Sequence, residues 1–204
     1  MAADSPTVFV IDDDVSILRS VSRVLRLADY TVEVFTSPPQ FLRRAPYEGP
    51  GCVIVDLQMP EMSGLELQQA ARANGSTLPV IFLSGQGDIQ TAVKAVKAGA
   101  VEFLEKPFVT DKLLEAVGSA LTAHRKLLEE GKTKAYYESR FQRLTPRERE
   151  VCLRVGRGLL NKQIAFELGA SEKTIKLHRA RVMRKLGIGS VAELVDLLRT
   201  IGEK

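Results

Sequence analysis

The chain has 204 residues, of which 45% are hydrophobic and 26% charged, and its formal net charge at pH 7 is +4. This composition is ordinary for a soluble globular protein. No apolar run approaches the roughly 18 residues that span a bilayer, and residues 1–6 lack the charged and apolar blocks of a signal peptide. We therefore expect a cytoplasmic protein with no membrane partner. The two cysteines, Cys52 and Cys152, lie in apolar runs without metal-ligand spacing, which indicates buried reduced thiols.

The charge is distributed unevenly along the chain. Residues 1–120 hold 10 Lys and Arg against 15 Asp and Glu, a net charge of −5, whereas residues 121–204 hold 19 against 10, a net charge of +9. An acidic half joined to a basic half predicts two domains, the second of which faces a polyanion. Charge alone leaves open whether that polyanion is DNA, RNA or an acidic protein.

The first 120 residues alternate short β-rich runs with segments of helical spacing. The β-rich runs cover residues 8–11, 31–35, 52–55, 79–83 and 101–104. The first, third and fourth runs are almost wholly apolar, as expected for central strands of a parallel sheet that is covered on both faces. Five such units predict a doubly wound α/β fold with a five-stranded parallel sheet. In sheets of this kind the functional site lies beyond the carboxyl ends of the strands.

A further helical pattern begins near Asp111 and becomes strongly charged across residues 122–143, with one interruption at Gly131. A charge run of this kind is by default a solvated helix face. We interpret the segment as a mostly helical linker, and the pattern leaves open whether it is one helix or two. A coiled-coil dimer contact also stays open, through Leu121, Leu128, Tyr136 and Phe141.

From residue 144 onward the chain carries only helical signals. Thr145-Pro146-Arg147-Glu148 is a capping box with proline at the first helical position, and it predicts a helix to about residue 155. Asn161 is predicted to cap a helix over 162–168, and Ser171 one over 172–186 that Gly187 ends. A second capping box at Ser190 predicts a helix to about residue 200.

Polar side chains follow four of the predicted strands. In chain order they are Asp12, Asp13, Asp14, Asp56, Ser84 and Lys106. Because the carboxyl ends of neighbouring parallel strands meet at one sheet edge, we expect these side chains to come together. Clustered carboxylates repel one another, and a hard divalent cation is the usual solution. Oxygen ligands favour Mg²⁺, for which Mn²⁺ can substitute.

This arrangement points to a particular chemistry. A carboxylate beside Mg²⁺ can attack a phosphoryl group and carry it as an acyl phosphate. We interpret Asp56 as that nucleophile and Asp12 and Asp13 as metal ligands. The Lys106 ammonium and the Ser84 hydroxyl would stabilise the phosphoryl oxygens. A single acidic residue at a strand end is more often a turn or cap residue, but chance rarely places such a set on four strand ends.

The sequence around these residues consists of Val10-Ile11-Asp12-Asp13-Asp14, Val55-Asp56-Leu57-Gln58-Met59-Pro60 with Gly64, Ser84-Gly85, and Phe103-Leu104-Glu105-Lys106-Pro107-Phe108. With these motifs residues 6–121 resemble the receiver domain of response regulators. The resemblance implies a flavodoxin-like sheet of order 2-1-3-4-5 with Asp56 as phosphoacceptor. It also implies that Phe103 stands where many receivers have a switch tyrosine, and that the Lys106-Pro107 peptide is cis.

The same resemblance implies a metal-ligand set. Asp13 and Asp56 would bind the metal directly, together with the backbone carbonyl oxygen of Gln58. Asp12 would act mostly through water. Asp14 is left as a neighbour in the loop, where it is expected to cap the following helix.

The turn Gly169-Ala170-Ser171 joins two predicted helices in the pattern of a helix-turn-helix, with residues 172–186 as the recognition helix. Ile175, Val182 and Leu186 form the apolar stripe that we expect to be buried. The residues expected to face a DNA groove or its phosphates are Lys173, Lys176, Leu177, Ala180, Arg179, Arg181, Arg184 and Lys185. A basic, solvated helix in a small bundle is the alternative.

The motifs of this basic segment lie at residues 144–151 (LTPREREV), 161–165 (NKQIA) and 171–176 (SEKTIK), with Leu168, His178 and Lys185-Leu186. With them residues 142–202 resemble the LuxR-type DNA-binding domain, and the whole chain is similar to the FixJ-type response regulators. By this resemblance base contacts fall on Lys176, Leu177, Ala180 and Arg179, and phosphate contacts on Lys162 and Thr174. Ala180 and Leu160 depart from the residues usual in relatives, and we expect altered specificity rather than lost binding. His178 is expected to pack.

The resulting hypothesis is a transcription regulator with a receiver domain, a linker and a DNA-binding domain over residues 1–121, 122–143 and 144–204. A sensor histidine kinase would transfer a phosphoryl group to Asp56. The phosphorylated chain would form a homodimer or release its basic domain, and two basic domains would bind paired half-sites of double-stranded DNA. RNA polymerase is a further expected partner.

In the expected switch, the new phosphoryl group pulls Ser84 and Lys106 inward. That movement shifts residues 85–87 and Phe103 and changes the face that carries residues 89–97.

Two alternatives can be compared with this hypothesis. Phosphohydrolases that pass through an aspartyl phosphate need an acid/base carboxylate two residues after the nucleophile, where this chain has Gln58. The expectation is therefore a protein that is not an enzyme. The second alternative is a DNA-binding protein with a vestigial receiver, and the complete set of polar residues at the strand ends argues against it.

Overall fold

The computed structural model describes residues 5–85 and 102–203. The chain divides into two compact units, Met1–Leu128 and Glu129–Lys204, and each unit is described by itself.

The first unit is a parallel sheet with helices on both faces. Its strands are β1 (Thr7–Ile11), β2 (Thr31–Phe35), β3 (Gly51–Asp56), β4 (Val80–Ser84) and β5 (Glu102–Glu105). Its described helices are α1 (Val15–Leu27), α2 (Pro38–Leu42), α3 (Gly64–Ala73) and the first part of α5 (Thr110–Gln142). The strand order is β2-β1-β3-β4-β5 and every pair is parallel, which confirms the predicted fold. Val101, predicted to begin the fifth strand, lies outside the described residues.

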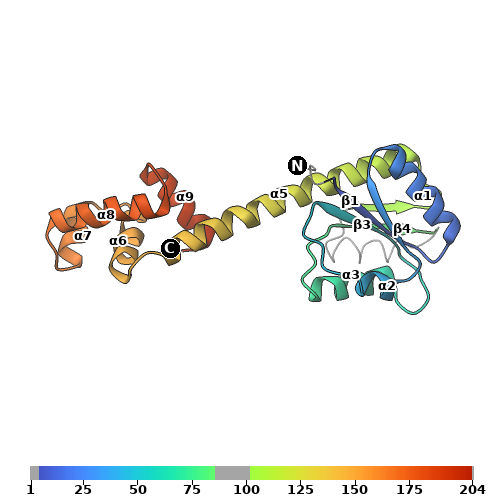
Figure 1. Ribbon diagram of the computed structural model, residues 1–204, viewed down its shortest axis with the longest axis horizontal. Helices are drawn as coiled ribbons and strands as arrows, with labels where there is room; N and C mark the ends of the chain where they lie inside the picture. Colours follow the sequence, from blue (N-terminus) through green and yellow to red (C-terminus); the bar gives the residue numbers. More distant parts are fainter. Residues whose placement is uncertain (1–4, 86–101, 204) are drawn as a thin grey trace. The chain divides into compact units, whose positions relative to one another are not determined.

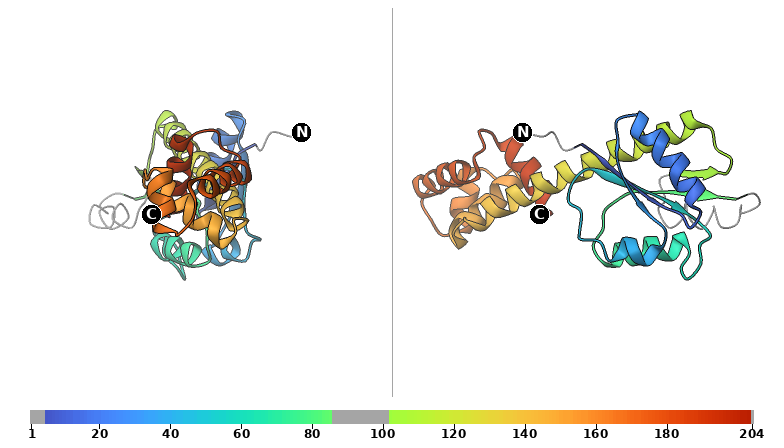
Figure 2. Two further views of the ribbon diagram at one scale, coloured as in Figure 1. Left: turned by 90° about the vertical axis from the view of Figure 1, so that its left-hand side faces the viewer. Right: turned by 45° about the vertical axis from the view of Figure 1, so that its right-hand side comes forward.

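The two faces of the sheet bury separate apolar clusters. Figures 1 and 2 show α1 and α5 on one face and α2 and α3 on the other. Because successive side chains of a strand point to opposite faces, Val8 and Val10 of β1 join the cluster under α1 and α5, whereas Phe9 and Ile11 join the one under α2 and α3. All five residues of β1 are buried, as expected for a central strand.

The structure shows how α1 begins and whether α5 is continuous. Asp14 caps α1 as expected, since its carboxylate accepts the N–H of Ser16 at 2.7 Å. Helix α5 runs without a break from Thr110 to Gln142, so the charged segment is one helix and Gly131 does not interrupt it. Among the residues that the structure describes, no helix combines the length and the apolar character needed to cross a bilayer.

The second unit contains the last turns of α5 and the helices α6 (Pro146–Gly156), α7 (Asn161–Glu167), α8 (Glu172–Leu186) and α9 (Val191–Ile201). They surround a single apolar cluster. Ile175, Val182 and Leu186 of α8 are each no more than 1% exposed, so the predicted apolar stripe is confirmed. The burial of this stripe leaves the opposite side of α8 exposed.

The prediction that Asn161 caps α7 was wrong. Asn161 is the first residue of the helix and Leu160 stands at the cap position, where its backbone N–H donates to Gln163 Oε1 at 2.8 Å. The side-chain oxygen of Asn161 instead accepts a hydrogen bond from Arg179 of α8 at 3.3 Å. A tertiary contact has replaced the local cap.

The other caps in this unit fall near their predicted places. Thr145 caps α6 in a full capping box, and Ser171 caps α8. At α9 the box is displaced by one residue. Ser190 Oγ accepts the N–H of Glu193 at 3.2 Å, but Glu193 Oε2 accepts the N–H of Gly189 at 3.0 Å.

Both cysteines, Cys52 and Cys152, are free and buried, as predicted. Burial raises the pKa of each thiol to about 12. At neutral pH both stay protonated, so neither is a candidate nucleophile.

His124 joins α5 to the N-terminal edge of the sheet. Its ring is 2% exposed, its Nδ1 accepts the backbone N–H of Gly51 at 3.1 Å, and its Nε2 lies 3.1 Å from Thr77 Oγ1. Because Nδ1 accepts, the ring proton lies on Nε2, which donates to Thr77. Burial lowers the pKa of His124, which favours this neutral form.

We expect acid to destabilise the first unit through His124. Its pKa is lower in the folded than in the unfolded chain, so the stability contributed by the neutral ring is complete above the ordinary histidine pKa of about 6.5 and is lost as the pH falls below it. His124→Asn keeps an acceptor in the place of Nδ1 but does not titrate. Its free energy of unfolding in urea should therefore change less between about pH 7.5 and about pH 5.5. Equal pH dependence in both chains would contradict this role.

Candidate functional site

Three carboxylates meet at the C-terminal edge of the sheet. Asp12 and Asp13 directly follow β1 and Asp56 is the last residue of β3, and the parallel register places Ile11 opposite Val55. One carboxylate oxygen of each aspartate lies within 4.8 Å of the others. Asp12 and Asp56 are buried and Asp13 is exposed. The cluster predicted from the strand ends is therefore present.

Lys106 supplies the positive charge for this cluster. Its Nζ donates to Asp12 Oδ2 at 2.7 Å and to Asp56 Oδ1 at 2.8 Å. The backbone N–H of Lys106 donates to the carbonyl of Ser84 at 2.7 Å, which ties the end of β5 to the end of β4. The Lys106-Pro107 peptide is cis, as the family resemblance implied.

Burial and charge oppose each other in this cluster. Burial raises the pKa of Asp56, and the contact with Lys106 only partly offsets that rise. Burial alone would lower the pKa of Lys106, but its hydrogen bonds to Asp12 and Asp56 outweigh burial and raise it. Lys106 therefore stays charged at neutral pH, and its ammonium is a counter-charge for the two buried carboxylates.

The donor set fits a hard divalent cation. Asp12, Asp13 and Asp56 offer only carboxylate oxygens, the ligands that Mg²⁺ and Mn²⁺ prefer over nitrogen or sulfur. Gln58, two residues after Asp56, has an exposed side chain. Its backbone carbonyl is the group that the family resemblance assigned to the metal.

The two predicted switch residues lie on neighbouring strands. Ser84 ends β4 and is 1% exposed, and its hydroxyl donates to the carbonyl of Gly85 at 2.8 Å. Phe103 in β5 is half-buried and packs against the apolar cluster under α2 and α3. Residues 86–87 and 89–97, which the predicted switch also involves, lie outside the described residues.

One close approach at this site was missed from the sequence. Gly64 begins α3, its N–H donates to the carbonyl of Leu57 at 3.0 Å, and a Cβ at Gly64 would lie 2.5 Å from the carbonyl oxygen of Asp56. Any side chain here would push α3 away from the backbone of Asp56. The sequence showed Gly64 only as part of a family motif, because the contact depends on the fold.

In the second unit most of the predicted DNA-facing residues are exposed. Exposed side chains on α8 and at the start of α7 are those of Lys173, Thr174, Lys176, Leu177, Ala180, Arg181, Arg184 and Lys162. Arg179 is half-buried and its guanidinium donates to Asn161 Oδ1, and Lys176 lies 3.7 Å from Glu172 in an exposed pair. His178 is half-buried, and its Nδ1 has no hydrogen-bond partner among the described residues.

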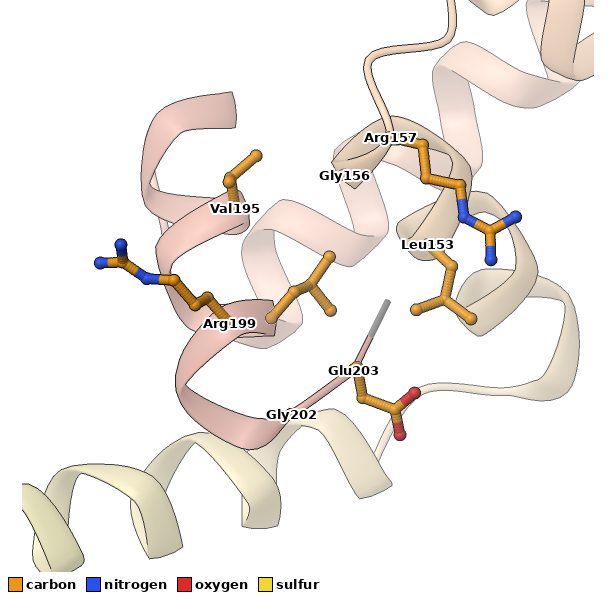
Figure 3. Close-up of a pocket in the computed structure, with 8 residues that line it drawn as sticks. Leu153, Gly156, Arg157, Val195, Arg199, Gly202 and Glu203 are labelled. Atoms are coloured by element: carbon orange, nitrogen blue, oxygen red, sulfur yellow. The ribbon is translucent and has the colours of Figure 1, made fainter.

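A hollow of about 470 Å³ lies on another part of this unit, between α6 and α9 (Figure 3). Leu153, Val195 and Leu198 form its apolar wall, and the charged side chains at its rim, such as Arg157 and Arg199, are exposed. It therefore offers a ligand no enclosed polar group, in contrast to the acidic cluster of the first unit.

Two family models match the chain. The model of the response regulator receiver domain matches residues 8–118, and that of the LuxR family of bacterial regulatory proteins matches residues 142–198. The first match contains the acidic cluster and the second contains α6 to α8.

Relatives match over nearly the whole length. The response regulator protein TodT of Pseudomonas putida is 40% identical over 195 residues, which are 96% of this chain and 86% of TodT. The transcriptional regulatory protein FixJ of Bradyrhizobium diazoefficiens is 37% identical over 195 residues, 96% of this chain and 95% of FixJ.

Solved structures agree with these matches. The response regulator StyR is 42% identical, with a TM-score of 0.84 over 96% of this chain and 98% of StyR. Full-length FixJ is 36% identical, with a TM-score of 0.59 over 96% of this chain and 97% of FixJ. The chain therefore belongs to the two-component response regulators that join a receiver domain to a LuxR-type DNA-binding domain, a family of transcription regulators and not of enzymes.

Proposed function

We propose that Asp56 accepts a phosphoryl group from a sensor histidine kinase and that this modification controls DNA binding by α8. A receiver domain implies a sensor kinase, and a LuxR-type domain implies DNA. The observation that carries the proposal is the ammonium of Lys106, which contacts both Asp12 and Asp56 at the edge of the sheet where Asp13 also lies. A cation held at this position can also stabilise the charge of a phosphoryl group on Asp56.

In the proposed reaction a carboxylate oxygen of Asp56 attacks phosphorus, the bond to the donor imidazole breaks, and an acyl phosphate forms. Asp12, Asp13, Asp56 and the backbone carbonyl of Gln58 would hold Mg²⁺ or Mn²⁺, an acidic triad being typical of this family's metal site. The bound cation would neutralise charge on the phosphoryl oxygens. The Gln58 side chain cannot act as the acid or base that would hydrolyse the acyl phosphate, and a long-lived acyl phosphate suits a switch.

In the proposed switch, the phosphoryl group on Asp56 would take over two existing hydrogen-bond donors, Lys106 and Ser84. Lys106 would exchange its bond to Asp56 Oδ1 for one to a phosphoryl oxygen, and the Ser84 hydroxyl would leave the carbonyl of Gly85 to donate to another. Ser84 ends β4 and Lys106 directly follows β5, so their movement would also shift Phe103 in β5. We propose that this change favours a homodimer.

For DNA we propose that α8 enters the major groove. Base edges would be contacted by Lys176, Leu177 and Ala180 with Arg179, and the surrounding groove and phosphates by Lys162, Lys173, Thr174, Arg181 and Arg184. The support is that Lys173, Thr174, Lys176, Leu177, Ala180, Arg181 and Arg184 of α8 are exposed, away from its buried stripe, as is Lys162 of α7, while Arg179 is half-buried. We further propose RNA polymerase as a partner, the cytoplasm as location, and a division into receiver, linker and DNA-binding domain at residues 1–121, 122–143 and 144–204.

The first test concerns the phosphoacceptor. Asp56→Asn keeps the shape of the side chain but removes the nucleophilic carboxylate, so we expect no phosphoryl uptake from acetyl phosphate in the presence of Mg²⁺. Intact-protein mass spectrometry measures that uptake. Asp14→Asn, which removes a neighbouring carboxylate that only caps α1, should take up phosphate normally. Unchanged uptake by Asp56→Asn would refute the assignment.

The second test concerns the counter-charge. Lys106→Met leaves two buried carboxylates without their cation, and we expect the free energy of unfolding to fall by about 2 to 3 kcal/mol without metal. Because a bound cation can replace the lost charge, Mg²⁺ should raise the melting temperature of this variant more than that of the unmodified chain. Lys112→Met, an exposed lysine of the same unit, is the control. Equal Mg²⁺ shifts in all three chains would refute the replacement of the Lys106 charge by the cation, and no shift in any chain would refute the proposed site.

The third test separates base from phosphate contacts. Lys162→Ala should weaken binding to all duplexes by a similar factor and reduce the slope of log affinity against log salt by about 0.9. Lys176→Ala should mainly reduce the preference for a duplex selected from a random pool, by roughly 10-fold. Lys112→Ala removes the same charge from the first unit as a control. If Lys176→Ala kept full sequence preference, its base contact would be excluded.

A further inference from the structure

The recognition helix α8 ends on a contact from α5. Gly187 has φ +70°, its N–H donates to the carbonyl of Met183 at 2.9 Å, and the N–H of Ile188 donates to the same carbonyl at 3.1 Å. The carbonyl of Leu186 accepts its hydrogen bond from another helix, from Arg140 NH1 at 2.9 Å. One of the last carbonyls of α8 is thus satisfied by a side chain of α5.

Arg140 is held in place for this contact. Its guanidinium carbon lies 4.6 Å from the ring centre of Tyr136, one turn earlier in α5. A Cβ at Gly187 would lie 1.9 Å from Arg140 NH1, so glycine is required there for the approach of the guanidinium as well as for the left-handed backbone. The cation also faces the partly negative C-terminal end of α8.

A second cation anchors the same turn of α8. Lys185 Nζ donates to Glu148 Oε2 at 2.5 Å and lies 3.4 Å from the carbonyl of Arg143. Burial would raise the pKa of Glu148, but the bonds from Lys185 and Thr145 outweigh it and lower the pKa. The last turn of α8 is therefore tied to the end of α5 and to the start of α6.

These contacts add direction to the packing of α8. Its buried side chains Ile175, Val182 and Leu186 hold the helix against the core, but apolar contacts are non-directional. A hydrogen bond from a planar guanidinium to a carbonyl constrains both distance and angle. Arg140 thereby limits the rotation of α8 about its own axis and its sliding along that axis.

We propose that Arg140 is a positioning residue for sequence recognition: it fixes the C-terminal end of α8 so that the exposed face meets the bases in one orientation. This inference rests on the proposed role of α8 as the recognition helix. Arg140 acts through Leu186 and does not touch DNA. Its loss therefore lowers discrimination between sequences more than it lowers overall affinity.

The experiment compares Arg140→Met with Lys134→Met in the full chain, treated with acetyl phosphate and Mg²⁺. Lys134 is an exposed cation of the same helix, paired with Glu138 at 3.9 Å. The probes are a duplex selected from a random pool by the unmodified chain and a duplex of mixed sequence. For Arg140→Met we expect roughly a 10-fold loss of affinity for the selected duplex and at most about a 2-fold loss for the mixed one. Lys134→Met should change the affinity for neither duplex.

Two further readouts separate positioning from direct contact. If Arg140 bound a phosphate, Arg140→Met would reduce the salt slope by about 0.9 and Arg140→Lys would restore binding. If Arg140 only positions α8, the salt dependence of DNA binding should be the same in Arg140→Met as in the unmodified chain. Arg140→Lys should not fully restore discrimination, because lysine lacks the planar guanidinium group. Hydrogen exchange of the Gly187 and Ile188 amides should be faster in Arg140→Met, while the amides of α6 keep their protection.

Each outcome decides the proposal. Unchanged discrimination, a reduced salt slope or unchanged exchange at Gly187 would each overturn it. If Arg140→Met lost its fold, Tyr136→Leu would remove only the ring beneath the guanidinium, and Tyr136 is 51% exposed. It should shift discrimination in the same direction, by a smaller factor. If the unmodified chain bound no duplex, the proposed function of α8 would fail, whereas hydrogen exchange would still test the anchor.

Discussion

The first unit depends on how it accommodates two buried carboxylates at one edge of a parallel sheet. The register that buries β1 and β3 on both faces also places Asp12 beside Asp56, where water can solvate neither well. A buried carboxylate without a partner is costly, and the ammonium of Lys106 supplies the partner for both. Since the backbone of Lys106 is bonded to Ser84, this charge balance is tied to the ends of β4 and β5. A change of charge at Asp56 should therefore alter the positions of the ends of β4 and β5.

Most of this unit could be predicted because parallel sheets leave few alternatives. Apolar runs identify the central strands, their carboxyl ends share one edge, and the polar residues that follow them must meet. The details that escaped prediction depend on atoms brought together only by the fold. Gly64 is needed because α3 approaches the carbonyl of Asp56, and the hydroxyl of Ser84 is bonded to Gly85. Neither contact leaves a periodic trace in the sequence.

The second unit shows the same limit at a helix end. The period of 3.6 residues was enough to predict the buried stripe of α8, and glycine after Leu186 was enough to predict its end. Asn161 has the side chain of a cap, yet Arg179 competes for its oxygen and Leu160 takes the cap position. Arg140 looked like one member of a charged run, because its acceptor lies 46 residues further along the chain.

Both units use a basic side chain to satisfy oxygen atoms at the end of an element, but with different consequences. The acceptors of Lys106 are charged, and phosphorylation would replace the single charge of the Asp56 carboxylate by the larger charge of an acyl phosphate, so its contacts are open to exchange. The acceptor of Arg140 is a neutral carbonyl that phosphorylation of Asp56 does not alter. If both proposals hold, the recognition helix keeps one shape in both states of the receiver. Control of DNA binding then acts on whether α8 can reach DNA, or on how many copies reach it together, and not on the geometry of its reading face.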